Sequence, residues 1–201
     1  RSLRGFVTMP MQILTADIGT GTQDILLFDS ERTPENCLKL VVPSPTLRLS
    51  REVRAATAAR LPLLITGRLM GGGPVSWAVG DHHRAGLPIL STEEPARTFN
   101  DDLEKVQREL GIVLIDDSAA AALTRAGRHA HIEFRDFDYA AIRQAFFAFG
   151  VDLRPDALAL AVFDHGAAPP DVSDRRFRMD YLEDRLRRDE RLSALAFQSQ
   201  D

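Results

Sequence analysis

The stretch MQILTADIGTGTQDILLFD, residues 11–29, joins two short apolar segments through a turn in which glycine and threonine alternate. Both segments have the length and the aliphatic content of β-strands, and the glycines mark the turn between them. A third apolar segment, LKLVVP at residues 38–43, follows the turn residues TPEN. On this pattern, the chain begins with a three-strand antiparallel meander.

Beyond the meander, helices alternate with strands. Helices are expected where apolar or alanine residues recur at helical spacing, and strands where short aliphatic runs stand between them. The expected helices cover residues 51–60 after a Ser50 cap, 75–86, 93–110, 139–149 and 175–191, with 118–126 as helix or linker. The expected strands cover residues 61–67, 87–90, 112–115, 132–134 and, as a buried strand, 157–163. This order predicts an α/β fold with a mixed sheet flanked by helices.

The composition narrows the class of protein. With 201 residues, of which 44% are apolar, the chain can bury a core as one large domain or two small ones. A formal net charge of −4 gives no general reason to bind nucleic acid or an acidic membrane surface. No apolar run approaches the roughly 20 residues that span a bilayer, so we expect a cytoplasmic protein with no nucleic-acid or membrane partner. Residues 1–10 lack the apolar stretch of a signal peptide, and we expect them to be a disordered or added segment before Met11.

The turn between the first two predicted strands has the residue types of a phosphate site. Gly19 and Gly21 let a phosphate approach the backbone N–H groups, and the hydroxyls of Thr20 and Thr22 add donors. The carboxylate of Asp17 would repel a bare phosphate, so it suits this place only with a divalent cation between the two. The alternative is a hairpin turn with a polar tip, because short glycine motifs also arise by chance.

Residues 13–29 resemble the first phosphate motif of the superfamily of actins, heat-shock chaperones and sugar kinases, in which a DxGT or DxGS turn joins the first two strands of a lobe. The meander, followed by a helix and a fourth strand, also resembles that lobe. More narrowly, the chain resembles a prokaryotic family of that superfamily, often labelled in genomes as related to the pyruvate formate-lyase activating enzyme. The segments that carry this resemblance are MQILTADIGTGTQDILLFD, ENCLKLVVPSPT, TGRLMGGGP, GDHHRAGLPI, ARTFNDDLEKV and AVFDHGAAP, which together span most of residues 11–170.

The resemblance implies an actin-like ATPase (ribonuclease H-like) lobe that binds ATP and Mg²⁺. By match of motif, it assigns this role to Asp17, Gly19, Thr20, Gly21 and Thr22. Members of the superfamily hold the nucleotide between two lobes. We therefore expect a first lobe at residues 11–170, followed by a helical extension at 171–201 that leads to a second lobe of the same protein. The expected partners are that lobe and a nucleotide or another phosphorylated small molecule.

One position departs from the motif. Many sugar kinases and actins carry a basic residue seven positions after the motif aspartate, whereas this chain has Asp24 there. At a separation of 4 Å, replacing attraction by repulsion changes the interaction with a phosphate by several kcal/mol. Three interpretations stay open: Asp24 points away, it binds a second cation, or the ligand is not a triphosphate.

The label of the narrower family does not fit the chemistry of this chain. An enzyme that activates pyruvate formate-lyase is a radical enzyme with a three-cysteine iron–sulfur motif, and Cys37 is the only cysteine here. We therefore expect no iron–sulfur cluster and no radical activating chemistry.

Three other junctions between a predicted strand and the next element carry polar or glycine residues. They are Gly71, Gly72 and Gly73, then Asp116 with Asp117, and then Asp164 with His165. If the strands are parallel neighbours, all three junctions share one edge with the Asp17 turn. The glycines can expose N–H groups of the following helix to an anion or simply form a flexible connection. Asp164 and His165 can orient a water as general base, or they form a polar turn.

The first hypothesis is a nucleotide-binding lobe of an ATPase or phosphotransferase. In it, Asp164 or His165 polarises the attacking water or hydroxyl. The second hypothesis is a non-catalytic ligand-binding or regulatory module of the same fold, in which Asp24 has removed triphosphate chemistry. The third is a metal-dependent hydrolase that uses Asp116, Asp164 and His165.

Overall fold

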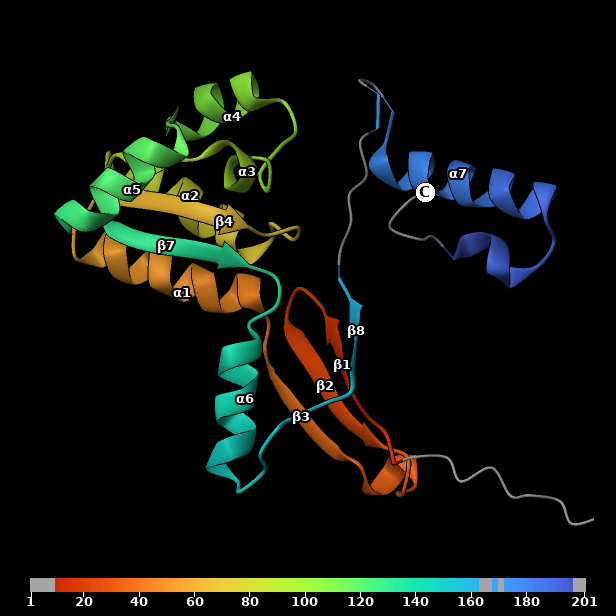
Figure 1. Ribbon diagram of the computed structural model, residues 1–201. Coiled ribbons are helices and arrows are strands. Elements are labelled where there is room, and N and C mark those ends of the chain that lie inside the picture. Colours follow the sequence, from red (N-terminus) through yellow and green to blue (C-terminus); the bar gives the residue numbers. More distant parts are fainter. Residues whose placement is uncertain (1–9, 163–167, 170–171, 197–201) are drawn as a thin grey trace, which may run out of the picture. The chain divides into compact units, whose positions relative to one another are not determined.

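The computed structural model describes residues 10–162, 168–169 and 172–196. The chain divides into two units, Arg1–Phe163 and Asp164–Asp201, each described here by itself. Within its described residues, the first unit holds two four-stranded sheets with helices packed on them (Figure 1). The α/β prediction is therefore confirmed. None of the described helices is long and apolar enough to cross a membrane.

The first sheet begins with the predicted meander. Strands β1 (Gln12–Ile18) and β2 (Thr22–Asp29) are antiparallel, and β2 pairs in the same way with β3 (Leu38–Pro43). A single 3₁₀ turn, η1 (Pro34–Asn36), connects β2 to β3. The fourth strand is β8 (Ala157–Ala161), which is parallel to β1 and gives the order β3-β2-β1-β8. The sheet is therefore mixed, as predicted, but its fourth strand comes from a part of the chain far beyond the first helix.

Helix α6 (Tyr139–Ala148) covers one face of this sheet, and Asp138 caps its first turn. The alternate residues of β1 and β2 that face α6 form a buried core with it. That core comprises Leu14, Ala16, Ile18, Ile25, Leu27, Ile142, Phe146 and Leu153. The prediction that residues 157–163 form a buried strand is wrong for the described part, because all five residues of β8 are exposed. Strand β8 lies at the edge of the sheet order and pairs only with β1 among the described strands.

The second sheet is parallel throughout, in the order β6-β5-β4-β7. Its strands are β4 (Leu63–Arg68), β5 (Ile89–Ser91), β6 (Ile112–Leu114) and β7 (Ala130–Arg135). The helices of this half are α1 (Pro45–Ala58), α2 (Pro74–Arg84), α3 (Glu93–Ala96), α4 (Leu103–Leu110) and α5 (Asp117–Ala126). Apolar residues of α1, α2 and α4 pack with those of β4 to β7 in a second core. Because the strands are parallel, their carboxyl ends lie along one edge of the sheet.

Two helix predictions need correction. Helix α1 begins at Pro45 with Ser44 as its cap, so Ser50 is not a cap but a buried residue inside the helix. The expected helix at residues 93–110 is interrupted, and Asp102 caps a new helix, α4. Phe99 lies in the interruption, yet it still packs on the core, which is why its spacing resembled one continuous apolar face.

The second unit contains the expected helix, α7 (Asp174–Arg188), and a short 3₁₀ helix, η2 (Leu192–Leu195). Ion pairs four residues apart run along α7, for example Arg187 with Glu183 and Arg188 with Asp184. Both members of each pair are exposed, so each pair stabilises the helix by only a few tenths of a kcal/mol.

Candidate functional site

Hydrogen bonds to two of its carbonyl oxygens hold the turn between β1 and β2 in place. We call residues 19–21 the hairpin turn. Ser44 donates from its backbone N–H to the Gly21 oxygen at 3.0 Å and from its hydroxyl to the Thr20 oxygen at 2.6 Å. The Gly19 N–H donates to the Thr22 oxygen at 2.9 Å, whereas the N–H groups of Thr20 and Gly21 donate to no described residue. The hairpin turn is therefore held from one side and leaves two N–H groups available.

The carboxylates of Asp17 and Asp24 stand side by side. They are direct partners in the antiparallel register of β1 and β2, and both residues are exposed. Residues in such a register have Cβ atoms about 4.5–5.5 Å apart, and like charges placed there repel each other. The Thr22 hydroxyl donates to Asp24 at 3.3 Å. Asp17 and Asp24 therefore leave the sheet on the same face.

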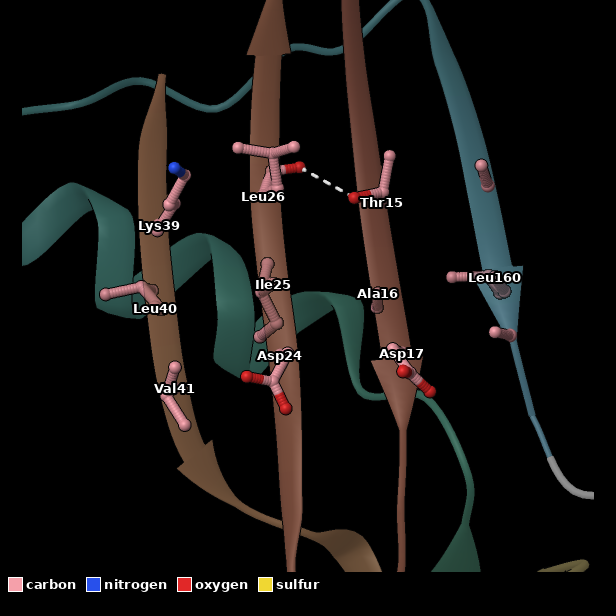
Figure 2. Close-up of a pocket in the computed structure, with 12 residues that line it drawn as sticks. Thr15, Ala16, Asp17, Asp24, Ile25, Leu26, Lys39, Leu40, Val41 and Leu160 are labelled. Atoms are coloured by element: carbon pink, nitrogen blue, oxygen red, sulfur yellow. Dashed lines mark hydrogen bonds between the residues drawn. The ribbon is translucent and has the colours of Figure 1, made fainter. Parts of the chain in front are cut away.

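A groove of about 530 Å³ extends from this acid pair over the sheet. Its side chains come from β1, β2, β3 and β8, and α6 lies behind the strands (Figure 2). Thr15, Leu26 and Lys39 line the part of the groove beyond the acid pair. The face of the first sheet that α6 leaves uncovered is therefore hollowed, and the two carboxylates lie in its wall.

The segment between β4 and α2 is a second tight loop, and we call residues 71–73 the glycine loop. The buried Thr46 hydroxyl of α1 donates to the Gly72 oxygen and accepts from the Val75 N–H at 3.3 Å. A Cβ atom built on Gly72 would lie 2.6 Å from the Ser76 hydroxyl oxygen and 3.2 Å from the Thr98 carbonyl oxygen, so the loop packs closely against both groups. Three N–H groups, those of Gly71, Gly72 and Gly73, donate to no described residue.

Asp136, which follows β7, fixes the residue before the glycine loop. Its carboxylate accepts the Met70 N–H at 3.0 and 3.1 Å. Partial burial raises the pKa of Asp136 above its ordinary value of 3.8, against the opposite effects of the Met70 N–H and of Arg68. The glycine loop is thus anchored at both ends by side chains from α1 and from the end of β7.

The hairpin turn and the glycine loop touch. Gly73 has a φ of +44°, and a Cβ atom built on it would lie 3.0 Å from the Cγ2 atom of Thr20. Two segments about 50 residues apart in the sequence, both predicted to bind phosphate, are therefore neighbours. Five backbone N–H groups without a described protein acceptor lie in these two loops.

Asp116 is engaged as a helix cap. It accepts from the Ala119 N–H at 2.8 Å and from the Ser118 hydroxyl at 2.6 Å, at the start of α5. The Ser118 hydroxyl, followed by the Ala119 N–H, lowers the pKa of Asp116 below 3.8. Helix capping therefore accounts for Asp116.

The predicted catalytic pair, Asp164 and His165, lies outside the described residues. Strand β8, which precedes the pair, belongs to the first sheet and not to the sheet that holds β4 and β6. The condition for the three junctions to share one sheet edge, that their strands are parallel neighbours, is therefore not met. However, Ala161 at the end of β8 is the register partner of Asp17, so the described part of β8 ends beside the acid pair.

A resident metal would have few protein ligands here. Among the described residues, no group of three or more histidine, cysteine, aspartate or glutamate side chains is placed to hold a metal ion. Asp17 and Asp24 nevertheless fit Mg²⁺, which is commonly bound by one or two carboxylates together with water and phosphate oxygens. The exposure of both acids leaves room for such water.

Sequence reasoning missed the residues that shape these loops: Ser44, Thr46 and Asp136. Ser44 could have been found, because a serine followed by proline is a strong helix start signal. Thr46 and Asp136 carry no local signal, since their role depends on contacts with a loop that lies 26 and 66 residues away in the sequence.

The comparisons with known proteins give one match. A family described as "Putative pyruvate format-lyase activating enzyme (DUF1786)" matches residues 70–201. The matched range includes the glycine loop and begins after the hairpin turn. No curated protein and no solved structure matches the chain.

Proposed function

The chain belongs to the family of that description, and we propose that it is the nucleotide-binding lobe of an actin-like ATPase or phosphotransferase. The observation that carries this proposal is the contact between Thr20 of the hairpin turn and Gly73 of the glycine loop. The resemblance of the hairpin to a DxGT phosphate motif and the mixed sheet that begins with a meander support the same assignment.

The two loops suit the phosphate groups of the ligand. Phosphate oxygens bind where several backbone N–H groups are free and no side chain blocks the approach. The N–H groups of Thr20, Gly21 and the three glycines of the glycine loop meet the first condition among the described residues. Pro74 begins α2 directly after the glycine loop, so the positive end of the helix dipole adds to the attraction.

The acid pair suits the cation that accompanies those phosphates. In this proposal Asp17 holds Mg²⁺ through water, and Asp24 binds the same ion or a second one. The chemistry that Mg²⁺ supplies is the neutralisation of phosphate charge. A cation held by these two carboxylates would remove the repulsion that a bare phosphate would meet there.

The chemical step requires a group that positions the acceptor. We assign this role to Asp164 or His165, which would orient the attacking water or hydroxyl. The described part of β8, which precedes these two residues in the chain, ends at Ala161, the register partner of Asp17. Catalysis by such a lobe consists mainly of positioning and charge stabilisation, with little covalent chemistry from the protein.

A second candidate function is a ligand-binding or regulatory module without turnover. The observation that favours it is the Asp17–Asp24 register, which places a second acid where many members of the superfamily carry a base. The metal-dependent hydrolase is less favoured, because Asp116 already caps α5 through two hydrogen bonds. Radical activating chemistry, which the family description names, lacks its cysteines in these 201 residues, since Cys37 stands alone.

Calorimetric titration of the 201-residue chain with ATP, with and without Mg²⁺, tests the proposal. We expect Mg²⁺-dependent binding that Asp17→Ala abolishes. The matched control is Asp152→Ala, which removes an exposed aspartate that pairs only with Arg154. Binding without hydrolysis in a parallel phosphate-release assay favours the regulatory module, and absence of ATP binding to the folded chain refutes the nucleotide-binding assignment.

A further inference from the structure

We propose that Trp77 is the stacking platform for the base of the bound nucleotide, so that the ligand is a nucleoside phosphate rather than a simple phosphate or polyphosphate. This inference rests on the proposed function, because it takes the phosphates to lie at the hairpin turn and the glycine loop. It adds a residue that recognises the rest of the ligand.

Trp77 stands one helical turn beyond the glycine loop. Its backbone N–H donates to the Gly73 oxygen at 3.3 Å, in the first turn of α2. Residues four apart lie on the same face of a helix, and helical side chains lean toward the N-terminus. The indole therefore extends from the face of α2 on which Gly73 lies, and Gly73 is the residue next to Thr20.

The opposite face of α2 holds the helix in the protein, so Trp77 is not needed for packing. Val75, Ala78, Val79 and His82 are buried, whereas 68% of Trp77 is exposed. A tryptophan buries a large apolar area when it packs, and tryptophans are enriched at interfaces, where one end of the ring is apolar and the other is polar. Within the described part of the chain, no aromatic ring pairs with Trp77.

Among the described residues, no cation stacks on the ring of Trp77 either. The next residue on its exposed stripe is Asp81, which forms an ion pair with Arg84. The guanidinium of Arg84 is thus engaged with a carboxylate one turn further along the helix. A flat, uncharged ring is the ligand group that fits an open indole face, and base–aromatic stacking contributes about 5- to 150-fold in affinity per base.

The test compares ligands that carry the same three phosphates. Mg²⁺-ATP and Mg²⁺-tripolyphosphate are titrated into the 201-residue chain by calorimetry and by tryptophan fluorescence, which reports on Trp77 alone because the chain has one tryptophan. We expect both ligands to bind, ATP roughly tenfold tighter, and only ATP to quench the fluorescence strongly. Trp77→Ala should lower ATP affinity about tenfold and leave tripolyphosphate affinity unchanged, while Trp77→Phe should keep most of the difference.

The outcomes separate this inference from the proposed function. If neither ligand binds the folded chain, the phosphate site itself is refuted. If both bind and Trp77→Ala changes neither affinity, the phosphate site stands and the stacking role is overturned. The control variant is Phe147→Ala, which removes another exposed aromatic ring, 70% accessible, from α6. Circular dichroism of each variant confirms that the fold is kept.

Discussion

Asp17 and Asp24 are direct partners across β1 and β2, so two exposed carboxylates lie on the same face of the first sheet, at the rim of its groove. This arrangement costs stability unless a cation lies between the two groups. A cation that binds at these two carboxylates would offset their repulsion. The pair can therefore be tested by stability measurements as well as by binding.

Asp24→Asn should stabilise the chain in the absence of divalent cations. It removes one of two facing like charges and keeps an acceptor for the Thr22 hydroxyl. We expect a gain of roughly 0.2–1 kcal/mol in the free energy of unfolding at low salt, which shrinks at 1 M salt because salt screens exposed charges. Urea denaturation at both salt concentrations measures this difference.

The same variant should respond less to Mg²⁺. If the acid pair holds the cation, millimolar Mg²⁺ stabilises the wild-type chain more than Asp24→Asn. Asp152→Asn is the control, because this exposed aspartate forms an ion pair with Arg154. Equal Mg²⁺ responses of the wild type and Asp24→Asn would exclude Asp24 as a cation ligand.

The contact between the two loops predicts coupling between Thr20 and Gly73. Gly73→Ala places a Cβ atom 3.0 Å from the Thr20 Cγ2 atom at a φ of +44°, so we expect a loss of about 1–3 kcal/mol in stability. Thr20→Ser removes Cγ2 and should recover part of that loss in the double variant. A double-mutant cycle measures the coupling, and Gly86→Ala, with a φ of +71° and open space around it, shows the backbone cost alone. A cycle that closes with no interaction term would mean that the loops do not meet.

Thr46 should be essential to the shape of the glycine loop. Its buried hydroxyl donates a hydrogen bond to the Gly72 oxygen and accepts one from the Val75 N–H. Thr46→Val keeps the shape of the side chain but removes both of these hydrogen bonds, so that the Val75 N–H and the Gly72 oxygen keep only the 3.2 Å bond between them, and we expect a loss of about 0.5–1.5 kcal/mol in unfolding free energy. Thr124→Val, at an exposed position where the hydroxyl bonds only the Ala120 oxygen, should cost much less. Similar losses in thermal unfolding for the two variants would contradict the role of Thr46.

Local signals in the sequence predicted the elements well. The meander and the helices α6 and α7 were identified from residue type and spacing. Each of these elements depends mainly on residues that are close together in the sequence, so a local pattern is enough to predict it. The interrupted helix between residues 93 and 110 was missed because Phe99 packs on the core from a turn, and periodicity does not distinguish that from a helical face.

Long-range pairing could not be predicted from the pattern. The apolar residues of β8 indicate a strand. They do not predict that this strand pairs with β1 or that it belongs to the first sheet. Its exposure follows from its position at the edge of the sheet order, which sequence hydrophobicity does not encode. For the same reason the contact of the hairpin turn with the glycine loop had to come from the structure, although each loop was recognised separately.

His82 predicts how stability depends on pH. The side chain is fully buried in α2, and its Nδ1 atom lies 2.8 Å from the Thr57 hydroxyl. Burial lowers the pKa of His82 below its ordinary value of 6.5, against a smaller opposite effect of the Pro88 carbonyl. In the window below 6.5 the unfolded chain therefore binds more protons than the folded one, so the free energy of unfolding falls as the pH falls.

The variant His82→Asn removes this titration while offering Thr57 a polar partner. We expect it to lower stability at pH 7.5, because the smaller side chain leaves a cavity, and to flatten the decline between pH 7 and 5. The difference in slope cannot exceed about 1.4 kcal/mol per pH unit for one proton. Urea denaturation across this range measures it, with His131→Asn, an exposed histidine of β7, as the control. Parallel pH profiles for the wild type and His82→Asn would show that His82 takes up its proton equally in both states, contrary to its burial.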